Sequence, residues 1–212
     1  MIATQPEPPG SAPVSLRGGL TPVRLSVSDV RSMVASGVVP DDCSTELIDG
    51  LLVVRDRGLG DRPMASPEHS FTVKQLRLAL ERQLPDDRLQ VHAESDAEVS
   101  SHNLPQPDVT VAAGGPLEYA HRYPLPADIR LVAEVANTSL DRDRGLKLRM
   151  YAAAGLSPYL IVNMLTRRVE VYERPEDGGY ANRREVGEGE TLTLELAGEP
   201  VTIDVSTLLP PD

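Results

Sequence analysis

The chain has 212 residues, of which 40% are hydrophobic and 25% charged, a composition typical of a globular protein with one buried core. It contains no apolar run long enough for a membrane-spanning helix, and its N-terminus lacks the basic and apolar regions of a signal peptide. A single cysteine, Cys43, excludes an intramolecular disulfide and a cysteine-rich zinc site, and it predicts a cytoplasmic location.

The net charge of −11 argues against a broad basic surface for non-specific binding to duplex DNA. It does not exclude a nucleic-acid enzyme, because carboxylates that hold a divalent metal add to the negative charge. With one Phe, six Tyr and no Trp, the chain is also poorly suited to stacking the bases of a single strand.

The N-terminal part predicts a tail, a short helix, a hairpin and a longer helix. Residues 1–22 are rich in Pro, Gly and Ser and are expected to be a loosely attached tail, with 23–212 forming a single domain. Ser26 is typical of a helix cap, and the helix is expected to run to about Ala35. Apolar residues around Asp49-Gly50 predict a hairpin over 45–54. Ser66 predicts the cap of a helix that extends to about residue 84.

The remainder of the chain predicts a sheet with one further helix. A long loop is expected over residues 114–128, and a helix carrying Asp143 and Lys147 is expected to end at Gly155. Strands are predicted over 88–94, 97–100, 108–112, 131–133, 158–163, 168–173, 180–186, 191–196 and 200–204. Together these elements predict an α/β fold, a mixed β-sheet flanked by about three helices and containing antiparallel hairpins.

Three acidic residues stand beside apolar strand sequence: Glu46 in the hairpin, Asp108 at a strand start and Glu134 at a strand end. Each alone could lie at a sheet edge or pair with an arginine, since a buried unpaired charge is costly. Together they are the hard oxygen ligands that Mg²⁺ or Mn²⁺ requires. Lys147 is one of only two lysines, in a chain whose other basic positions are arginines, which indicates a need for a compact ammonium.

Two further residues carry open alternatives. Asp143 and Lys147 are four residues apart on one helix face, and a surface ion pair explains them as well as a site does. His69, just after the cap of the second helix, could approach a phosphate or the site, but a histidine at such a helix start is more often a surface residue.

The order ELIDG, SPEH, PDV, EVANTSLDRDRGLKLRMYAAAG and a YxIV strand resembles the Uma-two family of restriction endonucleases, within the PD-(D/E)xK nuclease superfamily. The resemblance covers roughly residues 25–180. It implies a restriction-endonuclease-like fold and Mg²⁺- or Mn²⁺-dependent hydrolysis of DNA, double-stranded DNA in the first place. A membrane partner is not expected, and homodimerisation is left open.

Carried over by position, the resemblance implies roles for individual residues. Asp108 and Glu134 are the two metal-binding acids, Glu46 is an additional acid, and the carbonyl of Val135 is a further ligand. The lysine that normally follows the second acid by two residues is replaced by Ala136 and is supplied instead from the next helix. The catalytic set implied by the resemblance is therefore Asp108, Glu134, Lys147 and Glu46, and Asp143 matches a family acid of less certain role.

The chain departs from the family at three positions, with Asn137, Leu160 and Asn163 replacing an acid, an aromatic residue and an aspartate. These departures and the net charge support an alternative function, a catalytically inactive nuclease-like module that binds a partner. If the protein does cut DNA, phosphate contacts require a local basic rim. The candidates for that rim are Arg122, Arg130, Arg142, Arg144 and Arg149.

Overall fold

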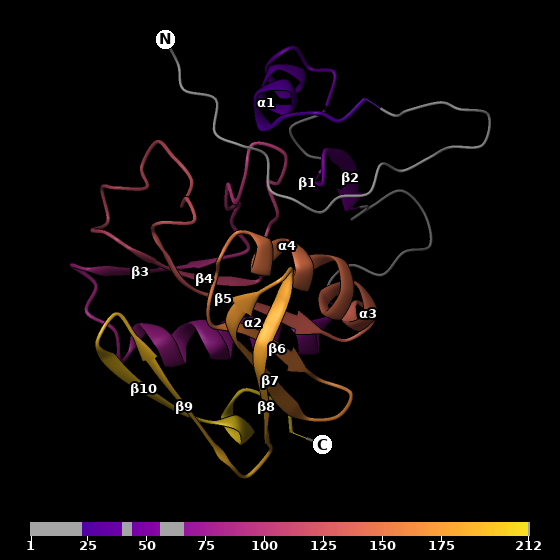
Figure 1. Ribbon diagram of the computed structural model, residues 1–212. Helices are drawn as coiled ribbons and strands as arrows, with labels where there is room; N and C mark the ends of the chain where they lie inside the picture. The colour runs from indigo at the N-terminus through magenta and orange to yellow at the C-terminus, as the bar shows by residue number, and fades with distance from the viewer. Residues whose placement is uncertain (1–22, 40–43, 56–65, 212) are drawn as a thin grey trace.

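The computed structural model describes residues 23–39, 44–55 and 66–211, so the predicted tail over 1–22 lies outside the described residues. Its centre is a six-stranded sheet in the order β3-β4-β5-β6-β7-β8. The strands β5 and β6 are parallel and all other neighbours are antiparallel (Figure 1). Their bounds are Leu89–Ala93 (β3), Val109–Ala113 (β4), Ile129–Ala136 (β5), Tyr159–Asn163 (β6), Arg168–Glu176 (β7) and Gly179–Gly187 (β8). The predicted mixed α/β fold is confirmed.

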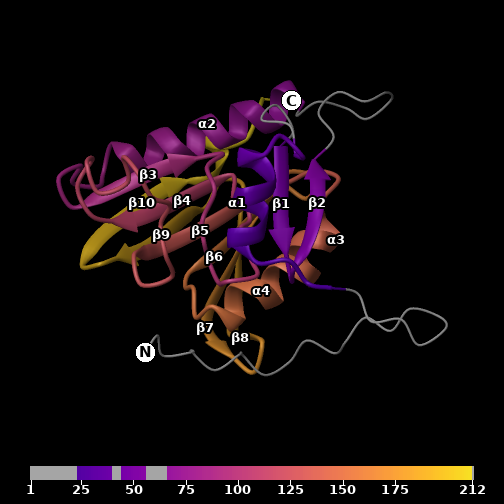
Figure 2. The same ribbon diagram turned by 90° about the horizontal axis from the view of Figure 1, so that it is seen from above.

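The two faces of the sheet are covered by different elements. The helix α2 (Pro67–Glu81) packs on one face, together with the hairpin of β9 (Thr191–Leu196) and β10 (Glu199–Asp204), as Figure 2 shows from above. The helix α4 (Leu148–Ala153) packs on the other face. A short 3₁₀ turn, Val205–Thr207, follows β10.

Alternation along β4 and β5 decides which side chains reach the α4 face. Val109 and Val111 join the core beneath α2, so Thr110 between them points the other way. On β5, Ala133 and Val135 likewise belong to the α2 core, which directs Glu134 to the face of α4. A charged residue at the centre of a buried strand is thereby brought to one defined side of the sheet.

Beyond the sheet lie α1 (Val27–Ala35) and the hairpin of β1 (Ser44–Ile48) and β2 (Leu51–Arg55). Both form as predicted: Ser26 makes a capping box with Asp29, and the Asp49-Gly50 turn has φ of 51° and 72°. The hairpin is attached to the segment before β4, because Leu47 and Leu104 exchange two backbone hydrogen bonds, of 3.1 and 2.8 Å.

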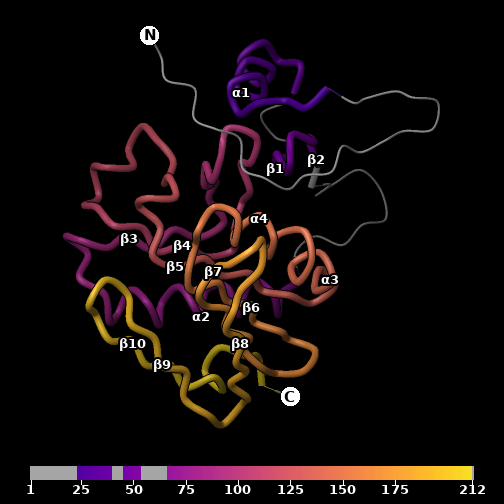
Figure 3. The backbone as a smooth tube through the Cα atoms, viewed as in Figure 1, coloured from indigo at the N-terminus to yellow at the C-terminus, as the bar shows by residue number. Residues whose placement is uncertain are grey.

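The strand predicted over 97–100 is wrong. Only an isolated bridge joins Ser100 to Asn103, because the chain reverses there and the N–H groups of Val99 and Ser100 both point to the carbonyl of Asn103. The helix α2 also ends at Glu81, before the predicted residue 84. The loop predicted over residues 114–128 is present as the connection from β4 to β5, traced in Figure 3.

The helix predicted after β5 is interrupted. It consists of α3 (Leu140–Arg142), a π-helical turn η1 (Asp143–Lys147) and α4. Single π-helical turns within helices are rare and are frequent at functional sites. This one contains two buried charged side chains, Asp143 and Lys147, with 1% and 0% of their surface exposed. The alternative of a surface ion pair is therefore wrong.

Among the described residues, no helix is long and apolar enough to cross a membrane.

Candidate metal-dependent active site

The ammonium of Lys147 lies between two carboxylates that come from distant parts of the chain. Its Nζ atom is 2.8 Å from Oε1 of Glu134 on β5 and 3.1 Å from Oε1 of Glu46 on β1. All three side chains are almost completely buried. The structure thus brings together three of the four residues of the predicted catalytic set by direct contact.

Asp108 joins this cluster through the antiparallel pairing of β4 and β5. Val109 pairs with Ala133, so Asp108, just before β4, lies level with Glu134. Its Oδ2 atom accepts a hydrogen bond of 2.7 Å from the backbone N–H of Val135. Through these contacts the four predicted catalytic residues occupy one region of the fold.

Glu46 is positioned by the attachment of the first hairpin. Its Oε1 atom accepts a 2.9 Å hydrogen bond from the backbone N–H of Gln106, two residues before Asp108. The same oxygen lies next to Lys147. Leu47, the residue after Glu46, is hydrogen-bonded to Leu104. The position of Glu46 is therefore fixed both by its own strand β1 and by the segment that leads to β4.

His69, on the first turn of α2, reaches the site from the opposite side of the sheet. Its Nε2 atom is 3.4 Å from Oδ1 of Asp108, and only 18% of its side chain is exposed. The alternative of a surface histidine is therefore wrong. Burial by itself would raise the pKa of Asp108, but the hydrogen bond and charge of His69, the charge of Lys147 and the N–H of Val135 together lower it.

Glu134 shows the opposite electrostatic balance. Burial raises the pKa of its carboxyl to about 8, the ammonium of Lys147 opposes that rise, and the carboxylates of Asp108, Asp143 and Glu46 add to it. Four buried acids thus surround one lysine. This excess of negative charge is costly to bury unless a proton or a cation compensates it.

Tyr151 is a site residue that the sequence reasoning missed. Its hydroxyl donates a 2.7 Å hydrogen bond to Oε1 of Glu134, the oxygen that Lys147 also contacts, and the side chain is fully buried. Burial raises its pKa well above the usual range, so the hydroxyl remains a donor. The sequence does indicate this residue, because Tyr151 follows Lys147 by four residues and so shares its helix face.

Asp143 lies beside the cluster with incomplete hydrogen bonding. Its Oδ2 atom accepts a 2.5 Å hydrogen bond from Ser139, while Oδ1 is buried without a hydrogen-bond partner among the described residues. Nε of Arg142 lies 3.6 Å from that Oδ1, close enough for an ion pair but too far for a hydrogen bond. Burial raises the pKa of Asp143.

The substituted residue Asn163 is not part of the cluster. It is buried on β6, where its amide nitrogen donates to Oε1 of Glu170 at 3.2 Å and its oxygen accepts from the N–H of Thr166. Glu170 is also bound by Arg144 and Tyr172. Asn163, which replaces the aspartate of the family pattern, therefore pairs with Glu170 and not with the acid cluster.

The donors fit a hard divalent cation in chemical type and in charge. Asp108 and Glu134 supply carboxylate oxygens, and the excess of buried negative charge is what a dication would offset. In the part of the chain that the structure describes, however, no three His, Cys, Asp or Glu side chains are arranged to hold a metal. A metal here would have two carboxylates and complete its shell with water and backbone oxygen, as Mg²⁺ commonly does.

Comparison with known proteins shows the family of the chain and a likeness to solved structures. The model of the Uma2 family, described as "Putative restriction endonuclease", matches residues 35–206. Among solved structures, the fold is similar to a crystal structure described as "a putative nuclease belonging to DUF820" from Anabaena variabilis ATCC 29413, with a TM-score of 0.61 and 12% sequence identity. The alignment covers 87% of this chain and 97% of that chain. No curated protein matches the sequence.

Proposed function

Because the chain belongs to the Uma2 family, we propose that it is an endonuclease that uses Mg²⁺ or Mn²⁺ to hydrolyse phosphodiester bonds of double-stranded DNA. The observation that carries the proposal is the buried cluster of Asp108, Glu134 and Lys147 at one end of β4 and β5. The family description and the nuclease-like fold support the reaction class. The single cysteine is consistent with a reducing cytoplasm.

In this proposal Asp108 and Glu134 hold the metal, with the carbonyl of Val135 as a further oxygen donor. The carboxylate of Glu46, which the sequence analysis expected as a third carboxylate ligand, assists instead by holding Lys147. Bound metal polarises the phosphodiester and lowers the pKa of a bound water. Asp108 suits a ligand role because its pKa is lowered, so it is ionised at neutral pH. The 2.7 Å bond from the N–H of Val135 holds its carboxylate in a fixed orientation.

Lys147 has the role of positioning the attacking water and stabilising negative charge on the phosphate. Its ammonium is held by Glu134 and Glu46, so its place relative to the metal ligands is determined before substrate arrives. A compact ammonium suits a confined buried position better than a planar guanidinium does.

Phosphate contacts are assigned to the helical segment that carries Lys147. Arg122 is bonded to Glu118 and Asp128, and Arg144 is bonded to Glu170, so these two candidates are already neutralised. Arg149 on α4 is exposed and makes no ion pair within the described residues. Arg142 is likewise ion-paired, with Asp143 at 3.6 Å, so we assign the basic rim to Arg149.

The test is nicking of supercoiled plasmid with Mg²⁺, with Mn²⁺ and with EDTA. Asp108→Asn and Glu134→Gln should each abolish the metal-dependent nicking while the protein stays folded, because each substitution keeps the size of the side chain and Lys147 retains Glu46 as a partner. Glu176→Gln, at an exposed position of β7, is the matched control and should cut normally. Equal nicking by wild type and Glu134→Gln would show that the activity does not come from this site.

A non-catalytic module is the second candidate, and one observation favours it. A single oxygen of Glu134 already accepts hydrogen bonds from both Lys147 and Tyr151, so the carboxylate is engaged without a metal. Titration calorimetry with Mn²⁺ separates the two candidates. Binding to wild type that is lost in Asp108→Asn supports the nuclease, whereas no binding to wild type, in the presence of duplex DNA, supports the module.

A further inference from the structure

His69 contacts the acid cluster, and the proposed function gives it no role. It lies in the first turn of α2, where its backbone N–H donates a 3.2 Å hydrogen bond to Oγ of Ser66, the helix cap. Val73 and Leu76 follow it by four and seven residues and are buried, so His69 begins the face of α2 that packs on the sheet. The imidazole is therefore carried by a packed helix.

The backbone of Asp108 is held in place, but this does not set the plane of its carboxylate. The carbonyl of Asp108 accepts a 3.0 Å hydrogen bond from the N–H of Glu94. The torsion that rotates the carboxylate of an aspartate has broad minima. The 2.7 Å hydrogen bond from the N–H of Val135 holds one oxygen, Oδ2. Because the carboxylate can still turn about that single attachment, a second contact is needed to set the position of Oδ1.

His69 supplies that second contact. Its Nε2 atom lies 3.4 Å from Oδ1 of Asp108, and the two side chains have 18% and 6% of their surface exposed. The pKa of Asp108 is lowered, so the carboxylate is ionised at neutral pH and only accepts hydrogen bonds. Nε2 is therefore the ring nitrogen expected to carry a proton. A distance of 3.4 Å is longer than an ordinary N–H···O bond, and such contacts in active sites often shorten when the site is loaded.

A carboxylate oxygen has two lone pairs, so an oxygen that accepts one hydrogen bond can still bind a cation. We propose that His69 is a positioning residue, which donates from Nε2 to Oδ1 of Asp108 and turns the carboxylate so that its remaining lone pairs face the metal. Groups that orient the ligands of a metal site commonly change its metal affinity by about 10–100-fold. This role rests on the metal-binding function proposed for Asp108.

Two other roles would also place an imidazole near Asp108. A direct metal ligand is not favoured, because within the described residues no three His, Cys, Asp or Glu side chains are arranged to hold a metal. A charge partner would need an imidazolium, whereas a positioning donor needs only an N–H group. Glutamine at position 69 separates these roles, because its amide nitrogen donates from a reach similar to that of Nε2, carries no charge and does not bind metal.

The first measurement is calorimetric titration of Mn²⁺ into the full chain without DNA. His69→Leu keeps the bulk of the side chain but donates nothing, and it should weaken Mn²⁺ binding about tenfold or more. His69→Gln should stay within about threefold of wild type, because the hydrogen bond is kept. Circular dichroism shows beforehand that each variant is folded. Absence of Mn²⁺ binding by wild type, equal affinity of wild type and His69→Leu, or an equal loss in His69→Gln and His69→Leu overturns the proposal.

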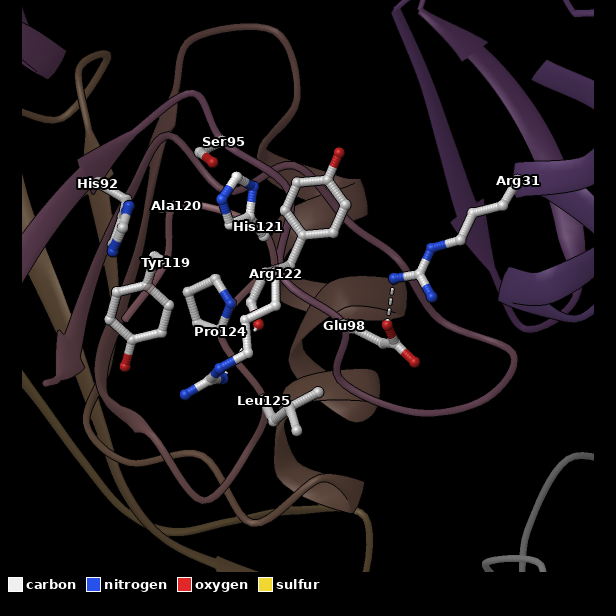
Figure 4. Close-up of a pocket in the computed structure, with 11 residues that line it drawn as sticks. Arg31, His92, Ser95, Glu98, Tyr119, Ala120, His121, Arg122, Pro124 and Leu125 are labelled. Carbon is white, nitrogen blue, oxygen red and sulfur yellow. Dashed lines mark hydrogen bonds and ion pairs between the residues drawn. The ribbon is translucent and has the colours of Figure 1, made fainter. Parts of the chain in front are cut away.

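The matched control is a second histidine, His121. It is exposed in the connection between β4 and β5, where it lines a hollow beside β3 together with Arg31 and Tyr119 (Figure 4). These residues do not belong to the acid cluster. His121→Leu should therefore bind Mn²⁺ as wild type does. A loss as large as that in His69→Leu would mean that the effect does not come from the contact with Asp108, and it would overturn the proposal.

The second measurement needs no metal. Nuclear magnetic resonance of the chain labelled with nitrogen-15 in its histidines reports which ring nitrogen carries the proton at neutral pH, and the signal that disappears in His69→Gln belongs to His69. A proton on Nε2 is expected. A neutral ring protonated only on Nδ1 overturns the proposal, whatever the metal titration shows. If His69→Leu does not fold, this result and the Mn²⁺ affinity of His69→Gln still decide the question.

Plasmid nicking separates this role from the proposed function. His69→Leu should need about tenfold more Mn²⁺ for half-maximal nicking but reach the wild-type rate at saturating Mn²⁺, because ligand orientation acts on metal binding. A lower rate at saturating Mn²⁺ with an unchanged Mn²⁺ requirement would place His69 in the chemical step and overturn the positioning role. Wild type that binds Mn²⁺ in a manner dependent on His69, yet does not nick, contradicts the nuclease and supports the role of His69.

Discussion

The ammonium of Lys147 donates to Oε1 of Glu134 over 2.8 Å, although the two residues are thirteen positions apart in the chain. Both side chains are buried, so this contact is shielded from solvent and stronger than a surface pair. Removing one partner of such a pair leaves an uncompensated charge in the interior. The contact therefore links the stability of the fold to the candidate site.

Replacing Lys147 should affect both activity and stability. We expect Lys147→Ala to abolish metal-dependent nicking and to lower the free energy of unfolding by about 3–5 kcal/mol, because Glu134 and Glu46 lose their cation. Lys147→Arg should also fail to cut, since the larger planar group does not fit the same enclosed space. Urea denaturation and plasmid nicking measure the two effects.

The other lysine provides the control for that experiment. Lys74 is exposed on α2, so Lys74→Ala and Lys74→Arg should leave both stability and nicking close to wild type. A Lys147→Arg protein that cuts as fast as wild type would contradict the requirement for a compact ammonium.

Tyr151 should act by orienting Glu134. In Tyr151→Phe the ring remains in place and only the 2.7 Å hydrogen bond to Oε1 is lost. We expect the rate of cleavage at saturating substrate to fall about tenfold with the substrate affinity unchanged, and the stability to fall by about 1 kcal/mol. Tyr180→Phe removes an equally short bond, to the carbonyl of Leu156, away from the site. It should reproduce the loss of stability without the loss of rate; a similar rate loss in both would mean that Tyr151 is only structural.

Glu170 should make the stability of the fold depend on acidic pH. Burial alone would raise its pKa, but hydrogen bonds from Arg144, Tyr172 and Asn163 lower it from 4.5 to about 2. A lowered pKa means that the ionised form stabilises the native state above about pH 4.5, and that this contribution is lost as pH falls toward 2. Glu170→Gln should therefore be less stable than wild type at pH 6, by about 1–3 kcal/mol. The difference should shrink steadily below pH 4.5 in urea denaturation series. A difference that stays constant with pH would refute the role of the charge.

Asn163→Asp restores the residue that the family pattern has at this position. In this chain it would place a second carboxylate 3.2 Å from Oε1 of Glu170. We expect the free energy of unfolding to fall by about 1–3 kcal/mol at pH 7, because the amide donor is lost and like charges are brought together. Plasmid nicking should not increase, since the residue does not contact Asp108 or Glu134. Asn163→Asp combined with Glu170→Gln should recover part of the stability by removing the repulsion, and no recovery would argue against this pairing.

Local chemistry in the sequence determined most of the secondary structure. Ser26 and Ser66 were recognised as helix caps, and Asp49-Gly50 as a hairpin turn, because each depends on backbone geometry within a few residues. Asp108 was placed correctly at the entry to β4, whereas Glu134, expected at the end of a strand, lies inside β5, which continues to Ala136. The strand expected over residues 97–100 failed for the same local reason, because its backbone groups bond across a tight reversal rather than to another strand.

The sequence by itself also singled out the charged residues that the structure buries together, since an acid or a lysine within apolar sequence is expensive to bury without a partner. Only the tertiary structure decided how they are partnered. The docking of β1 beside the approach to β4 brings Glu46 to Lys147, the register of β4 and β5 brings Asp108 level with Glu134, and the π-helical turn buries both Asp143 and Lys147. His69 and Tyr151 belong to the site for the same reason. Tyr151 shares a helix face with Lys147 in the sequence, but its contact with Glu134, like that of His69 with Asp108, depends on how the sheet and helices pack, which no local pattern encodes.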